Sequence, residues 1–195
     1  MNLYYTPRSH FSRKVRILLD ALKLEVELID VGNVADASTV AFGPNPLMKV
    51  PTLVDGEHVV FDSDHIAKYV VQRHDPNDRF NVLTDDIQSL NARAVMNGVM
   101  AAETELILAA RTGMDTSAHL RFDKIRESLR YGLDWLEFHA DLFPDEPSYL
   151  GFHLTAMWDH LVLFDLVPLS HEKLRDRVSR LSSLAYVAAS APPRL

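Results

Sequence analysis

The pattern of hydrophobic and polar residues divides the chain into two parts of different character. Residues 2–5 and 25–31 have the composition of strands, and the segment from Ser12 to Lys23 between them spaces its apolar residues as an amphipathic helix does. A strand, a helix and a second strand in this order form a right-handed β-α-β unit with parallel strands. The N-terminal part therefore begins as an α/β domain.

A β-hairpin is predicted next. Residues 52–54 and 58–61 are rich in β-forming side chains and are joined by residues 55–57, DGE. The dipeptide Asp-Gly between two such runs is a strong signal for a tight hairpin. The intervening residues 32–45 read as a loop, with a short helix near residues 35–41.

A helix that starts at Asp62 or Ser63 and runs to about Arg73 completes this part, because both residues are favoured N-caps before an apolar-periodic segment. The resulting order, β-α-β-(α)-β-β-α, is that of the thioredoxin-like fold. We therefore predict a thioredoxin-like α/β N-terminal domain.

Beyond a polar, proline-containing linker the chain shows only helical periods. We predict a domain over residues 1–75, a linker over 76–84 and an all-helical C-terminal domain over 85–195. The helices expected in the last part cover about 86–111, 117–142, 154–167 and 170–181, with a short one near Ala185. The third is apolar on all sides, as a central core helix is.

The bulk composition narrows the classes of function. The 195 residues are 47% hydrophobic, which suits one large domain or two small ones. A formal net charge of −7 argues against general affinity for nucleic acid or anionic membranes. No apolar run approaches the roughly 20 residues that span a bilayer, and the start lacks the pattern of a signal peptide. We expect a cytoplasmic protein without a nucleic-acid or membrane partner.

Cysteine and histidine usage constrains the chemistry. The absence of cysteine excludes disulfides, thiolate metal sites and cysteine nucleophiles, so thiol chemistry would need a thiol brought by the ligand. The nine histidines form no HExxH or comparable close-spaced set, so no metal site is expected.

The loop between the first strand and the first helix contains Ser9-His10-Phe11-Ser12, where redox thioredoxins carry CxxC. A serine hydroxyl at a helix N-terminus can donate a hydrogen bond to a thiolate, and the helix dipole adds positive potential. Together they would lower the pKa of a bound thiol. Ser9 is the first candidate and Ser12 the second, although either serine could simply cap the helix.

Two further elements converge with this loop in a thioredoxin-like fold. The proline before the third strand, here Pro51, is cis in this fold and exposes the backbone of Val50 to an extended peptide ligand. General statistics alone would favour a trans turn proline, since only about 5–6% of X-Pro bonds are cis. At the next helix start, Asp62 and Ser63 suit the ammonium and carboxylate of a ligand, or form a simple N-cap.

The chain resembles the bacterial glutathione transferases. The strings that carry the resemblance are LYYTPRSHFSRKVRILL, NPLMKVPTLV and FDSDHIAKYV, within residues 1–72. The helical remainder is similar to the C-terminal domain of that family in layout and length. The resemblance implies a cytoplasmic homodimer that uses glutathione as co-substrate and often adds its sulfur to a small electrophile. From the residue pattern, no metal cofactor is expected beside glutathione.

The resemblance also implies a role for single residues. Ser9 matches the catalytic residue whose hydroxyl stabilises the glutathione thiolate. Val50 matches the residue whose backbone pairs with the cysteinyl part, and Lys49 resembles a lysine that reaches the glycine carboxylate. Asp62 and Ser63 match the acid-serine pair that holds the γ-glutamyl end.

The pocket for the second substrate would lie between the domains. Arg8 and His10 stand where the family commonly has a small residue and proline, so the pocket mouth is more charged here. His10 is a candidate base for an acidic co-substrate or a solvated loop residue. The candidate lining residues are Tyr5, Thr6, Arg8, His10, Met96, Met100, Glu103, Thr104 and Ile107. Methionines at a spacing of four are more often core or dimer packing than a pocket wall.

The expected function is glutathione transfer to an electrophile, with the thiolate stabilised by Ser9. The alternatives are a glutathione-binding protein without turnover, or an isomerase, dehalogenase or peroxidase on the same scaffold.

Overall fold

The computed structural model describes residues 1–35 and 41–194, so the short helix expected near residues 35–41 lies largely outside the described residues. The N-terminal elements are β1 (Asn2–Tyr5), α1 (His10–Ala21), β2 (Glu27–Asp30), β3 (Thr52–Asp55), β4 (His58–Phe61) and α2 (Ser63–His74). They form a four-stranded sheet in the order β2-β1-β3-β4. β1 pairs with β2 in parallel and with β3 antiparallel.

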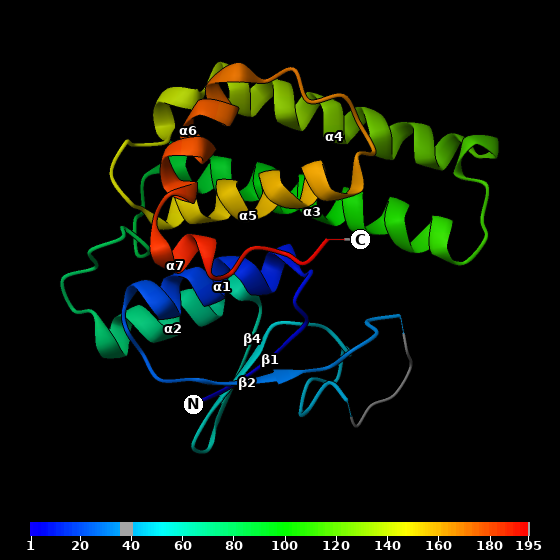
Figure 1. Cartoon of the computed structure of the whole chain (residues 1–195). Coiled ribbons are helices and arrows are strands. Elements are labelled where there is room, and N and C mark those ends of the chain that lie inside the picture. The colour runs from blue at the N-terminus through cyan, green and yellow to red at the C-terminus, as the bar shows by residue number, and fades with distance from the viewer. Residues whose placement is uncertain (36–40, 195) are drawn as a thin grey trace.

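Helices α1 and α2 lie between the sheet and the helical half of the molecule (Figure 1). Leu3 in the central strand β1 is fully buried and is paired with Leu28 and Leu53 in the neighbouring strands. Apolar residues of α1 and α2, such as Val15 and Ile66, complete this core. The β-α-β unit and the hairpin thus follow the predicted order.

The remaining elements are helical: α3 (Ile87–Arg111), η1 (Thr116–Ala118), α4 (Leu120–Phe138), η2 (Ala140–Leu142), α5 (Tyr149–Phe164), α6 (Glu172–Ser182) and α7 (Ala185–Ala188). α5 packs against α1, α3 and α6 at the centre of this half, and its apolar residues from Tyr149 to Leu161 are buried (Figure 1). The predicted fold class, a thioredoxin-like α/β domain followed by an all-helical domain, is confirmed.

The start of α5 differs from the prediction. The helix begins at Tyr149, five residues before the expected Leu154, because the Ser148 side chain caps it by accepting a hydrogen bond from Gly151 N at 3.1 Å. Thr155 lies inside the helix, where its hydroxyl donates to Gly151 O. The expected helix over 117–142 is instead interrupted, with short 3₁₀ turns on either side of α4.

The two halves share a buried contact surface. Tyr149 and Phe152 of α5 and Val187 of α7 belong to the same apolar cluster as the core of the N-terminal domain. In the part of the chain that the structure describes, no helix combines the length and the apolar character needed to cross a bilayer.

Candidate functional site

A cavity of about 1530 Å³ opens at the junction of the two domains. Its N-terminal wall is built by the β1–α1 loop, the segment before β3 and the start of α2. Its other wall comes from α3, α4 and α5. The predicted ligand-binding residues that line it are Ser9, Lys49, Val50, Pro51, Asp62 and Ser63. Three segments far apart in sequence therefore meet at one cavity.

Ser9 is the N-cap of α1. Its Oγ accepts a hydrogen bond from Ser12 N at 3.1 Å, so the hydroxyl hydrogen remains available for a ligand. Ser12 is fully buried and does not line the cavity, because the first turn of α1 points its side chain into the protein. Of the two serines, only Ser9 lies where a bound thiol could reach it.

The segment before β3 is stabilised by hydrogen bonds of the Asn45 side chain. The Val50–Pro51 peptide is cis, and both residues line the cavity with the exposed Lys49. The Asn45 side-chain amide donates to Lys49 O at 2.8 Å and to Thr52 Oγ1 at 2.9 Å. Asn45 was not among the predicted site residues, although it opens the NPLMKVP string that marks this segment.

The start of α2 forms a third side of the cavity. The Asp62 carboxylate accepts from Asp64 N at 2.9 Å and from His65 N at 3.4 Å, so it caps the helix while remaining exposed. Its backbone has φ 71°, in the region that L-residues rarely adopt. Ser63 is 3% exposed and lines the cavity beside it.

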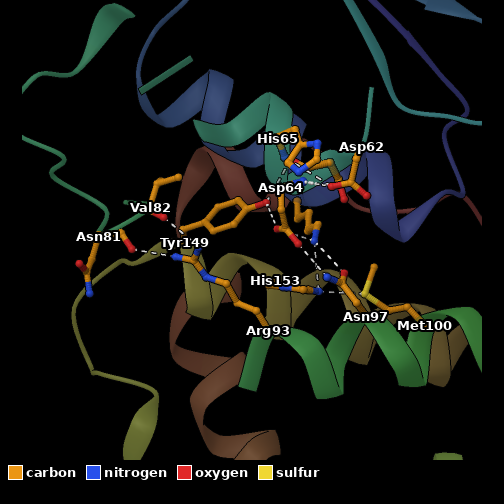
Figure 2. A network of polar contacts seen from close by, with 12 residues as sticks. Asp62, Asp64, His65, Asn81, Val82, Arg93, Asn97, Met100, Tyr149 and His153 are labelled. Atoms are coloured by element: carbon orange, nitrogen blue, oxygen red, sulfur yellow. Dashed lines mark hydrogen bonds and ion pairs between the residues drawn. The ribbon is translucent and has the colours of Figure 1, made fainter. Parts of the chain in front are cut away.

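A buried polar network joins this helix start to the C-terminal domain (Figure 2). Asp64 Oδ1 lies 2.9 Å from Lys14 Nζ and accepts from Tyr149 OH at 2.7 Å, while Asn97 donates to Asp64 Oδ2 at 2.7 Å. Tyr149 OH also lies 3.3 Å from Ser63 O. The network ties the backbone of the cavity wall to α3 and α5.

The charges of this network are set by competing effects. Burial disfavours the ionised form of Asp64, but Lys14, His153 and the hydrogen bonds outweigh it and hold the pKa of Asp64 well below its usual range. Burial lowers the pKa of Lys14, against the attraction of Asp64. The short contact stabilises both charged groups, and the hydrogen bonds from Tyr149 and Asn97 stabilise the Asp64 carboxylate. Lys14 and Asp64 therefore form an ion pair.

His10 is not a solvated loop residue. It is the first residue of α1, is 2% exposed and lines the cavity. Its Nδ1 lies 3.5 Å from Glu103 Oε2, and its ring centroid lies 3.9 Å from that of His160. Burial lowers the pKa of His10 to about 4, although the nearby Glu103 carboxylate opposes this shift. No spacing motif marks His160, which comes from α5.

The other candidates for the second-substrate pocket divide into two groups. Arg8 lines the cavity, and its guanidinium donates to Arg194 O at 3.0 Å. Tyr5, Met100 and Glu103 do not line the cavity. The Tyr5 ring lies 5.0 Å from the Arg16 guanidinium. Met100 and Glu103 are fully buried on the inner face of α3. Of the remaining candidates, Thr6, Thr104 and Ile107 line the cavity and Met96 does not.

Comparison with known proteins identifies the N-terminal domain. Residues 3–78 match the family model described as glutathione S-transferase, N-terminal domain. No curated protein sequence matched the chain.

Solved structures cover nearly the whole chain. A glutathione S-transferase from Methylobacterium radiotolerans, in complex with glutathione sulfonate, is 22% identical with a TM-score of 0.82 over 100% of this chain and 95% of its own. One from Methylobacillus flagellatus with glutathione bound is 21% identical with a TM-score of 0.81, covering 98% and 99%. A family member from Pseudomonas fluorescens Pf-5 with bound S-(propanoic acid)-glutathione is 24% identical with a TM-score of 0.78, again covering 98% and 99%. Residues 3–78 thus match the family model of the glutathione S-transferase N-terminal domain, and the chain as a whole has the glutathione S-transferase fold.

Proposed function

We propose that the protein is a glutathione transferase that binds reduced glutathione in the cavity described above. The observation that carries the proposal is the convergence of Ser9, Val50 and Ser63 on one cavity wall, each from a different loop or helix start. In this proposal the γ-glutamyl end lies at Asp62 and Ser63. The cysteinyl backbone pairs with Val50, and the thiol lies at Ser9.

The charge of the ligand supports this orientation. The exposed Asp62 carboxylate suits the γ-glutamyl ammonium, while the backbone N–H and the hydroxyl of Ser63 suit its carboxylate. Lys49, which is exposed at the other end of this wall, suits the glycine carboxylate. The sparsely populated backbone conformation of Asp62 also fits a functional position, since such residues cluster at ligand sites.

Ser9 supplies the chemistry in this proposal. Its hydroxyl donates to the sulfur, and the N-terminus of α1 adds positive potential, so the thiol loses its proton to solvent more readily. The thiolate attacks an electrophilic carbon; a carbon–sulfur bond forms and the displaced group, where there is one, leaves with its electron pair. A lowering of the thiol pKa by one to two units corresponds to about 1.4 kcal/mol for each unit.

A conjugation assay with a panel of soft electrophiles tests the proposal, with the parent protein and the Ser9→Ala variant side by side. We expect turnover by the parent and a large loss in the variant. Glutathione binding without turnover across the panel would favour a non-catalytic binding protein. Turnover of an isomerisable, halogenated or peroxide substrate alone would favour the corresponding glutathione-dependent reaction on the same scaffold.

The proposal includes a homodimer in the cytoplasm, as the family resemblance implies. Light scattering of the purified chain would measure its mass in solution, and a monomer at all concentrations would contradict the dimer without affecting the glutathione site.

A further inference from the structure

Two histidines and a glutamate from three different helices meet beside the cavity. His10 begins α1, Glu103 lies in the middle of α3, and His160 lies near the end of α5. Glu103 Oε2 is 3.5 Å from His10 Nδ1 and 2.8 Å from His160 Nδ1. One donor atom from each residue can be chosen so that all three lie within 4.8 Å of one another.

This cluster is buried and incompletely satisfied. Glu103 is 0% exposed, and among the described residues neither of its carboxylate oxygens has a hydrogen-bond partner of good geometry. The same holds for Nδ1 of His10 and of His160, even though the latter lies at hydrogen-bond distance from the carboxylate. A buried carboxylate is costly unless it is paired or coordinates a metal, so this arrangement calls for a positively charged partner.

Two buried cationic side chains of α1, Lys14 and Arg13, already form ion pairs with carboxylates other than Glu103. Lys14 pairs with Asp64 at 2.9 Å, and Arg13 pairs with Asp159 at 2.7 Å. Neither residue forms an ion pair with Glu103 in the part of the chain that the structure describes.

A threonine beside the cluster offers a partner to the second nitrogen of His10. The Thr104 hydroxyl donates to Met100 O at 2.9 Å, and its oxygen lies 3.4 Å from His10 Nε2. When Nδ1 binds a metal ion, the proton of the ring lies on Nε2 and the Thr104 oxygen can accept from it. This is the arrangement of a metal-ligating histidine, whose second nitrogen donates to a neighbouring oxygen.

We propose that His10, Glu103 and His160 form a binding site for a divalent transition-metal ion of the zinc type. Two imidazoles and one carboxylate are a donor set that such ions favour. Ligand bonds of about 2.0–2.2 Å place the donors of a tetrahedral site roughly 3.4 Å apart, which small side-chain movements within this cluster can reach. Three protein ligands leave a fourth position open, as in catalytic zinc sites.

The open position would face the ligand cavity. His10 and His160 both line it, and His160 lies beside Phe164, which also lines it. A metal here could therefore bind an oxygen atom of a second molecule in the cavity. The site does not depend on the proposed glutathione function, because none of its three ligands belongs to the glutathione-binding set.

The test uses the full-length, tag-free protein after removal of metals with a chelator. Titration with Co²⁺ should produce the visible absorption bands of a four- or five-coordinate ion, saturating at one ion per chain, and Zn²⁺ should displace it. Zn²⁺ should also raise the melting temperature. We expect the Glu103→Gln and His160→Gln variants to bind at least ~10-fold more weakly, since even loss of an outer-shell partner typically costs 10- to 100-fold.

Two controls separate the site from general surface binding. Glu105→Gln removes an acid of the same helix that pairs with Arg121, and His74→Asn removes an exposed histidine; both should bind Co²⁺ as the parent does. Absence of the Co²⁺ bands in the parent would overturn the proposal, as would equal affinity in both ligand variants. If either ligand variant fails to fold, the Co²⁺ spectrum of the parent protein and its saturation at one ion per chain still decide whether the site exists.

Discussion

At the scale of single residues, the geometry of Ser9 accommodates both roles that the sequence left as alternatives: the helix cap, which the structure shows, and the proposed stabilisation of a thiolate. Its oxygen caps α1 through Ser12 N, and this bond fixes the hydroxyl at the cavity edge while leaving its hydrogen free. Capping and thiolate stabilisation are therefore compatible, because one uses the lone pair of the oxygen and the other uses the O–H group.

The Ser9→Ala variant should raise the pKa of glutathione bound to the protein by about one unit, because the hydroxyl donor to the thiolate is lost while the N-terminus of α1 remains. The thiolate absorbance of the binary complex, followed against pH, measures this change. The variant should also lose about 1 kcal/mol of stability with the cap.

Ser12→Ala is the matched control for this measurement. Its hydroxyl is buried away from the cavity, so the pKa of the bound thiol should equal that of the parent. A Ser9→Ala variant with an unshifted thiol pKa would remove Ser9 from the proposed chemistry.

At the scale of elements, the N-cap of α5 determines where the side chains of this helix lie relative to the N-terminal domain and the cavity. Ser148 starts the helix, and the helix then carries Tyr149 and His153 into the interdomain network and His160 to the cavity. The start and rotation of α5 thus determine which side chains face the N-terminal domain.

Ser148→Ala should destabilise the protein by about 1 kcal/mol, because Gly151 N loses its side-chain acceptor at a site that is 7% exposed. Chemical denaturation monitored by circular dichroism measures the change. Thr155→Val is the control: its hydroxyl only bonds back to Gly151 O within the helix, so a smaller loss is expected. A Ser148→Ala variant as stable as the parent would contradict the assigned cap.

The elements that the sequence predicted well carry local signals. The Asp-Gly hairpin and the caps at Ser9 and Asp62 are set by neighbouring residues. Of the glutathione-side candidates, Ser9, Asp62 and Ser63 lie at those caps, and Lys49 and Val50 directly precede the hairpin. The start of α5 was misplaced because its first residues are apolar on all sides, so periodicity does not mark the boundary.

The pocket for the second substrate was harder to predict, because its lining depends on the rotation of the long helices relative to each other. Met100 and Glu103 lie on the face of α3 that turns into the core, whereas Thr104 and Ile107 reach the cavity. His160 is brought to this side by the packing of α5, which no local pattern encodes.

At the scale of the whole molecule, the two domains are joined by polar as well as apolar contacts. The Lys14–Asp64 pair lies in this junction. The Tyr149 hydroxyl, which contacts both Asp64 Oδ1 and Ser63 O, links the pair to the C-terminal domain (Figure 2). Lys14 is 0% exposed, so its charge depends on its partner.

Asp64→Asn should lower the free energy of unfolding at neutral pH by about 3 kcal/mol, because it leaves the buried Lys14 ammonium without its counter-charge. Lys14→Met should cost less, since it removes the buried charge while Asp64, which is 24% exposed, keeps its bonds from Tyr149 and Asn97. Equilibrium denaturation measures the free energy of unfolding of both variants. Equal losses would contradict the expectation that Asp64→Asn costs more than Lys14→Met.

The same pair has a pH signature. The pKa of Asp64 is lower in the folded than in the unfolded chain, so its stabilising contribution is complete above the unfolded value of about 3.9 and is lost as the pH falls toward the folded value. Asp64→Asn should therefore lose less stability than the parent on acidification below pH ~4, and an identical acid dependence would contradict the assignment.

The most direct test of the central claim is a calorimetric titration of the purified protein with reduced glutathione, beside the Ser63→Ala variant. The proposed site predicts saturable binding by the parent and about tenfold weaker binding by the variant, the loss expected for one hydrogen bond to a charged group. No binding to the parent at millimolar glutathione would contradict the assignment of this cavity to glutathione.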